Sequence, residues 1–268
     1  MANELACACT IAGSDSSGGA GIQADIKTFA AIGVWGVSVV TAVTAQNTRT
    51  VIGAWRMPGE AVVAQLAAVL EDFPVGAIKT GLLCDRDTIH ALHDYMPLDI
   101  PLILDPVMIS TSGYTFLKPE AIEEVKDHLV PRTTIITPNL AEAATLAGME
   151  TITTLDEMRE AAEKILDLGP KAVIVKGGHL PAEEAMDFFM DSEGEEILKG
   201  ERFPYEVHGT GCCFSAALTA YMAMGCDERT AFTRAKAFVS GAIGRAYPAM
   251  SGRRSVRPTE PAYEEGYD

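Results

Sequence analysis

Basic residues are few in this chain of 268 residues, where 21 lysines and arginines stand against 37 aspartates and glutamates and give a formal net charge of −16. The basic residues are scattered, so no basic stripe is available to neutralise a phosphate backbone, and we expect no nucleic-acid partner. An anionic ligand must then be met by local donors, such as the backbone N–H groups at a helix start. The search for a site therefore turns to glycine-rich turns.

A basic leader and a long hydrophobic run are also missing. The first residues carry no basic segment, and the apolar stretch that begins at Leu5 soon meets Gly13-Ser14-Asp15. This pattern predicts neither a signal peptide nor a membrane span, and we expect a cytoplasmic protein. The six cysteines include no Cys-x-x-Cys pair, which excludes a zinc knuckle or disulfide scaffold and predicts reduced thiols, with Cys7 and Cys9 in the core.

Two common nucleotide-binding motifs are absent. The chain contains neither G-x-x-x-x-G-K-[ST] nor G-x-G-x-x-G, which argues against a P-loop and against a Rossmann fingerprint. The 24 glycines need another explanation.

What the chain does contain is an alternation of strand and helix patterns. Val62, Leu66, Val69 and Leu70 fall on one face of a helix, and other segments repeat this spacing. The predicted strands lie at 5–12, 37–43, 77–79, 102–104, 134–137 and 172–175, and the predicted helices at 22–32, 62–70, 85–95, 122–129, 141–147, 156–168, 212–224 and 228–246. Repeated βα units predict an α/β fold with a mostly parallel central sheet and helices on both sides.

The pattern changes toward the end of the chain. Residues 187–190 and 196–198 flank Ser192-Glu193-Gly194 and predict an antiparallel hairpin appended to the sheet. From Pro248 onward the sequence has no periodicity. We therefore expect a single domain over residues 1–247 and a mobile tail over residues 248–268.

The turn at residues 209–211 is the most informative of the turns that follow predicted strands, where ligands of an open parallel sheet bind. Gly209-Thr210-Gly211 leads directly into a helix, so unpaired N–H groups there can meet an anion. Cys212 follows at the helix start, where the helix field is expected to lower its pKa and make it a proton acceptor. The alternative is a small-residue turn followed by a buried thiol.

Other polar residues after strands each allow two interpretations. Asn139 and Glu142 have the spacing of a capping box, while Glu142 and Asp105 are also candidate ligands of a hydrated Mg²⁺. Lys176 either meets phosphate as a point charge or extends its charged end to solvent. His179 is either a lid residue or a solvated loop histidine.

Taken in order, these segments resemble the signature of the hydroxymethylpyrimidine/phosphomethylpyrimidine kinase family over residues 5–245. The matching segments are Ala12-Gly13-Ser14-Asp15-x-Ser17-Gly18-Gly19-Ala20-Gly21-Ile22-Gln23-Ala24-Asp25, Thr41-Ala42-x-x-Ala45-Gln46-Asn47-Thr48, Asp105-Pro106-Val107-Met108, Thr137-Pro138-Asn139-x-x-Glu142, Lys176-Gly177-Gly178-His179 and His208-Gly209-Thr210-Gly211-Cys212. Each segment alone is weak, but the ordered set is specific.

The resemblance implies a ribokinase-like three-layer α/β/α fold, a homodimer, and two ATP- and Mg²⁺-dependent phosphorylations on the route to thiamin. The alcohol is phosphorylated first and its monophosphate second. Cys212 would take the alcohol proton, while the amides of residues 209–211 and Lys176 would hold the transferring phosphoryl group. The implied pyrimidine pocket is Gly13, Asp25, Gln46, Leu82 and Val107; the implied ATP side is Asp105, Asn139, Glu142, Lys176, His179 and Thr210, with Asp105 and Glu142 nearest the metal.

The chain departs from the family pattern in three places. Lys79-Thr80-Gly81-Leu82-Leu83 replaces the commoner Lys-Ile-Gly-Met-Leu, Trp35 replaces a smaller residue, and residues 251–257 replace a glycine- and histidine-rich ending. Substrate fit is therefore open to change, and pyridoxal or pyridoxine kinase is the nearest alternative. A non-catalytic pyrimidine-binding regulator and a redox role for Cys212-Cys213 are alternatives of other classes.

Overall fold

Nine strands form one sheet in the computed structural model, which describes residues 5–109, 113–178, 180–181 and 183–258. The strand order is β3-β2-β1-β4-β5-β6-β7-β8-β9. The strands are β1 Cys7–Asp15, β2 Trp35–Gln46, β3 Val51–Arg56, β4 Val75–Thr80, β5 Leu102–Leu104, β6 Ile135–Ile136, β7 Ala172–Gly177, β8 Ala185–Asp191 and β9 Gly194–Gly200.

The six central strands, from β2 to β7 in that order, run parallel to one another. Strand β3 pairs antiparallel with β2 at one edge, and the β8–β9 hairpin extends the sheet antiparallel from β7 at the other. The predicted mostly parallel sheet with an appended hairpin is confirmed. Because the central strands are parallel, their carboxyl ends meet along one edge of the sheet.

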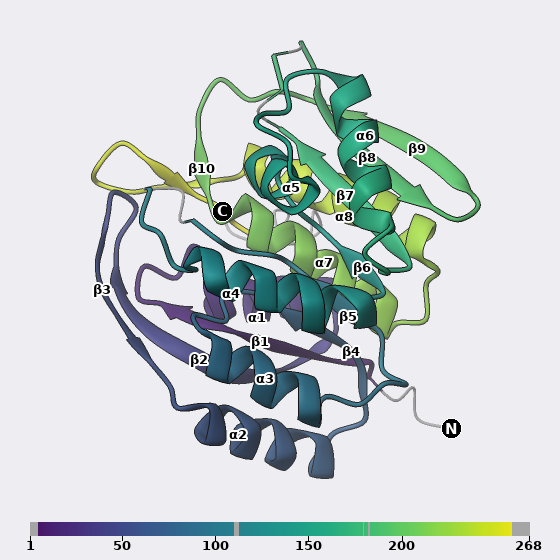
Figure 1. The fold of residues 1–268 in the computed structure, drawn as a ribbon. Coiled ribbons are helices and arrows are strands. Elements are labelled where there is room, and N and C mark those ends of the chain that lie inside the picture. Colours follow the sequence, from purple (N-terminus) through teal and green to yellow (C-terminus); the bar gives the residue numbers. More distant parts are fainter. Residues whose placement is uncertain (1–4, 110–112, 179, 182, 259–268) are drawn as a thin grey trace.

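Helices cover both faces of this sheet and make a three-layer α/β/α molecule (Figure 1). One layer holds α1, α7 and α8, whose apolar sides pack on the sheet through Phe29, Leu218 and Phe232. The other holds α2 to α6 and a larger core. The helices are α1 Gly21–Ile32, α2 Gly59–Asp72, α3 Arg86–Tyr95, α4 Pro119–Glu124, α5 Leu140–Ala147, α6 Leu155–Leu166, α7 Thr210–Ala223 and α8 Glu228–Gly244.

Local sequence signals place several of these helices. Asp85 caps α3 by accepting from the Thr88 N–H, and Val62 and Leu66 of α2 are fully buried, as their spacing predicts. Helix α4 continues into one π-helical turn, η1 Val125–Leu129, and a 3₁₀ turn, η2 Val130–Arg132. The predicted helix around residues 122–129 is thus confirmed, although it changes from an α-helix to a π-helix at Val125.

The segment after residue 247 has more structure than its composition indicated. Strands β11 Tyr247–Pro248 and β12 Arg254–Ser255 join β10 Val207–His208 in a small second sheet, and Val256 is buried against α7 and α8. Regular structure therefore extends past the predicted boundary at residue 248. Mobility of the tail stays a prediction, and residues 259–268 lie outside the described part.

The cysteines behave as small apolar residues or free thiols. Cys7 and Cys9 are buried in the core, as predicted, and all six cysteines are unpaired. Among the helices that the structure describes, none is both long and apolar enough to cross a membrane.

Candidate active site

Charged side chains gather at the carboxyl edge of the parallel strands, facing the first turn of α7. Lys79 lies near the end of β4, Asp105 directly follows β5, and Lys176 lies near the end of β7. Asn139 begins α5 beside β7, since it pairs with Lys176 as an isolated bridge. Residues that are distant in sequence thus come together where the topology predicts a ligand.

The turn before α7 depends on two glycines. Gly209 is the N-cap of α7 with φ 87°, and a Cβ atom there would lie 1.6 Å from the carbonyl oxygen of Gly19, so only glycine fits. A Cβ atom on Gly211 would lie 3.2 Å from Lys176 Nζ. The turn that carries Thr210 therefore packs against the first glycine-rich loop, residues 16–20 between β1 and α1, with the Lys176 ammonium group beside the amides of the turn.

Asp105 links this lysine to α7. Its Oδ1 accepts from Lys176 Nζ at 2.9 Å and its Oδ2 accepts from Ser215 Oγ at 3.0 Å. Burial acts to raise the pKa of Asp105, but Lys176 and Lys79 outweigh it and lower the pKa below its usual value. Asp105 is therefore an ionised carboxylate in a buried position.

Glu142 forms the capping box that its spacing predicted. Its Oε2 accepts from the Asn139 N–H at 2.8 Å, and its own N–H donates to Asn139 Oδ1 at 3.0 Å. Burial raises the pKa of Glu142 to about 7, Lys176 acts against this rise, and the nearby Asp105 charge adds to it. Capping does not exclude a metal role, because the effect of the Asp105 charge on the pKa of Glu142 shows that the two carboxylates are near neighbours.

Lys79 is a site residue to which the sequence analysis assigned no role, although the segment that carries it was noted. It is fully buried, and its Nζ donates to Asp25 Oδ2 at 2.8 Å, where Thr10 Oγ1 also donates at 2.6 Å. Burial acts to lower the pKa of Lys79, but Asp25, Cys212 and Asp105 together raise it, so the lysine is charged. The available signal was a single lysine at the end of an apolar strand.

Asp25, one of the residues implied for the pyrimidine pocket, lies beside Lys79. It is the fifth residue of α1 and is completely buried. Its second oxygen, Oδ1, has no hydrogen-bond partner among the described residues, and neither has the buried Thr80 Oγ1. Unpaired buried polar atoms are costly, so these two point to a ligand that pairs with them.

The expectation that the helix field lowers the pKa of Cys212 is wrong. Cys212 is the third residue of α7, and burial raises the pKa of its thiol to about 12. The charge of Lys79 and the Gly21 N–H act to lower this pKa, whereas Asp25 and Asp105 raise it further. Removing the thiolate from water outweighs the field of the helix. Cys213 is a packing residue, fully buried, and accepts from Thr28 Oγ1 at 3.5 Å.

The predicted pyrimidine residues surround the first glycine-rich loop. A Cβ atom on Gly13 would lie 2.9 Å from Leu82 Cδ2, so these two residues are in contact. The Leu82 carbonyl oxygen accepts from Thr41 Oγ1 at 2.5 Å, and this bond holds the Leu82 backbone in place beside Gly13. Gln46 Nε2 lies 3.2 Å from His208 Nε2 at the other end of the loop. Val107 follows Asp105 by two residues and is half-buried.

His208 is a second residue that the sequence analysis did not single out. Its Nε2 lies 3.0 Å from Asp15 Oδ2, and Asp15 in turn accepts from the N–H groups of Ser17 and Ala20. The contact between His208 and Asp15 therefore connects the turn before α7 to the first glycine-rich loop. The predicted site residue His179 lies outside the described residues.

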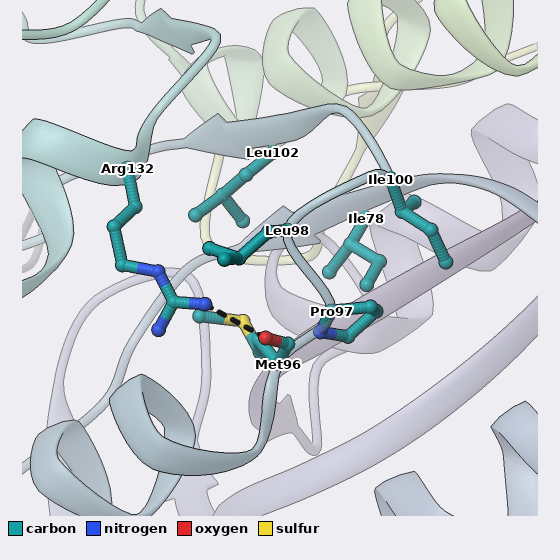
Figure 2. Close-up of a pocket in the computed structure, with 7 residues that line it drawn as sticks. All are labelled: Ile78, Met96, Pro97, Leu98, Ile100, Leu102 and Arg132. Atoms are coloured by element: carbon teal, nitrogen blue, oxygen red, sulfur yellow. Dashed lines mark hydrogen bonds between the residues drawn. The ribbon is translucent and has the colours of Figure 1, made fainter.

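Two hollows lie elsewhere on the molecule. Figure 2 shows one at the amino end of β5, between Leu102, the preceding residues 96–98 and Ile78 of β4, with a volume of about 10 Å³, which is enough for one water molecule at most. The other, of about 540 Å³, lies on the outer side of the first loop, beside Lys27, Asn47, Tyr247 and Arg257. Neither is lined by the charged residues of the carboxyl edge.

A three-layer fold whose buried lysines, carboxylates and helix-start amides meet at the carboxyl edge of a parallel sheet defines a ribokinase-like small-molecule kinase. Comparison with known proteins gives the family. The model of the phosphomethylpyrimidine kinase family matches residues 15–257, so the chain belongs to that family.

Three relatives place the chain more closely. The hydroxymethylpyrimidine/phosphomethylpyrimidine kinase of Rhizobium meliloti (strain 1021) is 45% identical over 243 residues, covering 90% of this chain and 91% of the relative. The crystal structure of phosphomethylpyrimidine kinase from Clostridium difficile 630 is 43% identical, with a TM-score of 0.77 over 88% of this chain and 99% of that one. Pyridoxal kinase from Staphylococcus aureus, in complex with AMP-PCP and pyridoxal, is 33% identical, with a TM-score of 0.87 over 98% and 96%.

Proposed function

We propose that this protein transfers the terminal phosphoryl group of ATP to 4-amino-5-hydroxymethyl-2-methylpyrimidine, and then to the resulting monophosphate, in thiamin biosynthesis. The observation that carries the proposal is the meeting of Lys176, Asp105 and the first turn of α7 beside Cys212, in a chain of this family. The names of the relatives support the substrate, and the AMP-PCP complex of a structural neighbour supports ATP.

Phosphoryl transfer needs positioning and neutralisation of charge more than covalent chemistry. The backbone N–H groups from Gly209 to Gly211 would face the transferring group, and Lys176 would place its ammonium group on the same oxygens. Asp105 holds Lys176 in place at 2.9 Å, so the charge is positioned before the substrates bind. Thr210 and Asn139 would complete the ATP side.

Cys212 would accept the proton of the alcohol. Since its pKa is about 12, the thiolate is scarce at neutral pH but is a strong base when formed. The ammonium group of Lys79 acts to lower this pKa and so favours the thiolate. The thiolate is needed as the transition state forms, when the alcohol oxygen begins to bond to phosphorus and its proton must leave.

The pyrimidine would lie between the first loop and the end of β4. The unpaired Asp25 Oδ1 suits a donor such as the exocyclic amino group, and Gln46 offers an amide to a ring nitrogen. Gly13, Leu82 and Val107 would pack on the ring. Thr80 Oγ1 supplies a further unpaired polar atom where the family pattern has an apolar residue.

Asp105 and Glu142 would hold Mg²⁺ through water. The effect of the Asp105 charge on the pKa of Glu142 fits two carboxylates near one cation, and oxygen ligands suit this ion. When bound, Mg²⁺ supplies charge neutralisation on the phosphate oxygens. Its presence would also keep Glu142 ionised at neutral pH.

A homodimer and a cytoplasmic location complete the proposal. Trp35, Val43, Ile52 and Trp55 of β2 and β3 are exposed large apolar residues, with Ile52 exposed by 77%. Strands β3 and β2 are the two outermost strands at one edge of the sheet. An exposed apolar surface of this kind suits contact with a second copy of the chain. Light scattering of the purified protein would test the subunit number.

The test of the activity is mass spectrometry of products from ATP, Mg²⁺ and each candidate alcohol in parallel. We expect the pyrimidine alcohol to give a monophosphate and then a diphosphate. Faster turnover of pyridoxal would reassign the substrate to the one bound in the structural neighbour. Binding of the pyrimidine without ADP formation would favour a regulator instead.

A further inference from the structure

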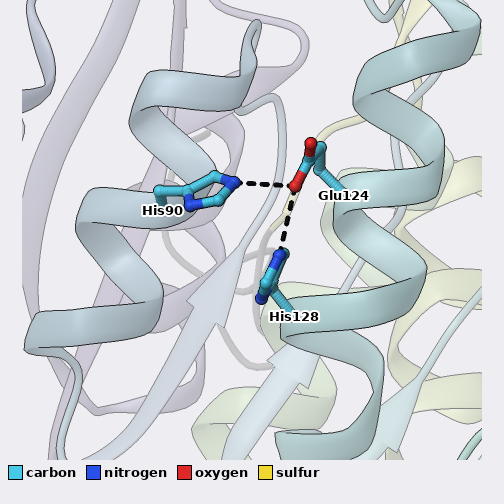
Figure 3. Close-up of side chains that lie close together, drawn as sticks. All are labelled: His90, Glu124 and His128. Atoms are coloured by element: carbon cyan, nitrogen blue, oxygen red, sulfur yellow. Dashed lines mark hydrogen bonds and ion pairs between the residues drawn. The ribbon is translucent and has the colours of Figure 1, made fainter.

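Three side chains with metal-binding atoms meet between α3 and the α4–η1 segment, and none of them belongs to the proposed active site. Figure 3 shows His90 from α3 and His128 from η1 both directed at Glu124, the last residue of α4. Glu124 Oε2 lies 2.7 Å from His90 Nε2 and 3.1 Å from His128 Nε2. The ligand atoms of all three residues lie within 4.8 Å of one another.

The helices fix this arrangement before any ligand arrives. Glu124 and His128 are four residues apart across the junction of α4 and the π-helical turn, which places both side chains on one face. π-helical turns within helices are frequent at functional sites. His93, one turn beyond His90, bonds through Nδ1 to the His128 carbonyl oxygen at 2.9 Å, and so connects α3 to the segment that carries His128.

Both imidazoles direct a ring nitrogen at the same carboxylate oxygen. His90 Nε2 lies 2.7 Å from Glu124 Oε2, which can only accept, so without a metal this nitrogen carries the proton. Arg86 Nε lies 3.3 Å from His90 Nε2 but has a closer acceptor in Glu124 Oε1, at 2.9 Å. A metal ion can take the place of the shared protons, because it binds the nitrogen lone pairs and the carboxylate together.

We propose that His90, Glu124 and His128 bind a divalent transition-metal ion of the Zn²⁺ class. Zn–N and Zn–O bonds of roughly 2.0 to 2.2 Å place tetrahedral ligands about 3.4 Å apart. The two distances to Glu124 therefore need to lengthen by less than about 1 Å, and the distance between the two imidazole nitrogens, at most 4.8 Å, needs to shorten by at most about 1.4 Å. The side chains are between 18% and 38% exposed, which leaves room for water as a fourth ligand. Two imidazoles and one carboxylate suit Zn²⁺, Co²⁺ or Ni²⁺ rather than Mg²⁺.

Arg86 both orients and weakens this site. Its Nε lies 2.9 Å from Glu124 Oε1, the carboxylate oxygen that the imidazoles leave free, and so holds the carboxylate in place. Its positive charge also repels a cation. Because the side chain is 68% exposed, it can move away when a metal enters.

Metal binding would join α3 to α4. Helix α4 follows the loop that begins with Val107 and Met108, so the site would stabilise the layer beside the pyrimidine pocket without touching the reacting groups. The effect would be a rise in melting temperature, because a ligand that binds only the folded protein stabilises it.

The experiment is calorimetric titration of Zn²⁺ alone into the full chain without an affinity tag, nucleotide or Mg²⁺. We expect one site that is lost or weakened at least about tenfold in His90→Gln, His128→Gln and Glu124→Gln. Glu123→Gln is the matched control, since Glu123 is the neighbouring carboxylate and pairs with Lys126 instead. It should change the affinity less than about twofold.

Two further measurements test which residues bind the metal. Arg86→Gln should bind Zn²⁺ several-fold more tightly, because it removes a repelling charge at close range. Co²⁺ bound to the wild type should show ligand-field absorption without a thiolate charge-transfer band, which separates this site from the cysteines. Wild-type affinity in Glu124→Gln, an equal loss in Glu123→Gln, or a thiolate band would each overturn the proposal.

Discussion

The two ends of strand β5 differ sharply although the strand is only three residues long. At its amino end, Leu102 and the neighbouring Ile78 of β4 line a mostly apolar hollow of about 10 Å³. At its carboxyl end, Asp105 pairs with Lys176, and Lys79, the residue after Ile78 on the opposite face of β4, is buried as an ion pair with Asp25. Buried ion pairs seldom stabilise a fold more than apolar packing does. The buried charges at this end are therefore explained by selection for activity rather than for stability.

The largest expected effect comes from removing the proposed base at the charged end. Cys212→Ala should lower turnover by roughly 10²- to 10⁴-fold, because the proton must leave the alcohol in the transition state. Pyrimidine binding should change less than about threefold, since the ground state does not use the proton transfer. Single-turnover kinetics and equilibrium binding measure the two quantities separately. The matched control is Cys213→Ala, which should retain near-normal turnover if it folds.

Removing Lys79 should affect both stability and activity. Lys79→Met leaves Asp25 as an unpaired buried carboxylate and should lower the free energy of unfolding by about 3 to 5 kcal/mol. The double variant Asp25→Asn/Lys79→Met removes both charges and should recover much of this loss but not the turnover. Denaturant unfolding measures the first effect, and the assay measures the second. A stable and fully active double variant would contradict the role of the pair.

Glu142→Gln should separate capping from metal binding, because glutamine can still accept from the Asn139 N–H. We expect half-maximal turnover to need about tenfold more Mg²⁺. Glu157→Gln is the matched control, since Glu157 forms an equivalent capping box with Thr154 at the surface.

The same variant tests the raised pKa of Glu142. A folded-state pKa of about 7, above the ordinary glutamate value of 4.5, means that the folded state binds the proton more tightly than the unfolded state does. The contribution of Glu142 to stability is therefore present below about pH 4.5 and lost as the pH rises through 7. Without Mg²⁺, Glu142→Gln should lack this loss. An identical pH dependence of unfolding in both proteins would contradict the assigned pKa.

The smallest effect is expected at the amino end. Ile78→Val should lower the free energy of unfolding by about 1 kcal/mol, as for other buried Ile→Val changes, and leave turnover unchanged. A large fall in turnover for this neighbour of Lys79 would mean that the two ends are not functionally separate.

Periodicity predicted the framework well, since the apolar run in β7 and the helical spacing in α2 report burial directly. It missed β3, where Gly53 and Trp55 interrupt the apolar pattern, and the two-residue strands β10, β11 and β12, which are too short to carry a period. These strands are defined by pairing with distant segments, and local sequence contains no record of that pairing.

The site was predictable where a spacing has a local cause, as for Asn139 and Glu142. It was not predictable where tertiary burial decides. The pKa of Cys212 is raised because the surrounding elements remove it from water, and Lys79 is important because Asp25 lies 2.8 Å away across 54 residues of sequence. Neither fact can be read from a spacing.

The most direct test of the proposed chemistry is the pH dependence of the single-turnover rate in wild type and in Cys212→Asp, between about pH 8 and 9.5. With a thiol pKa of about 12, the thiolate fraction rises tenfold per pH unit, so the wild-type rate should rise with a slope near one. The aspartate variant is already ionised and should give a flat profile with measurable turnover. A flat wild-type profile, or parallel profiles in the two proteins, would contradict a thiolate base at residue 212.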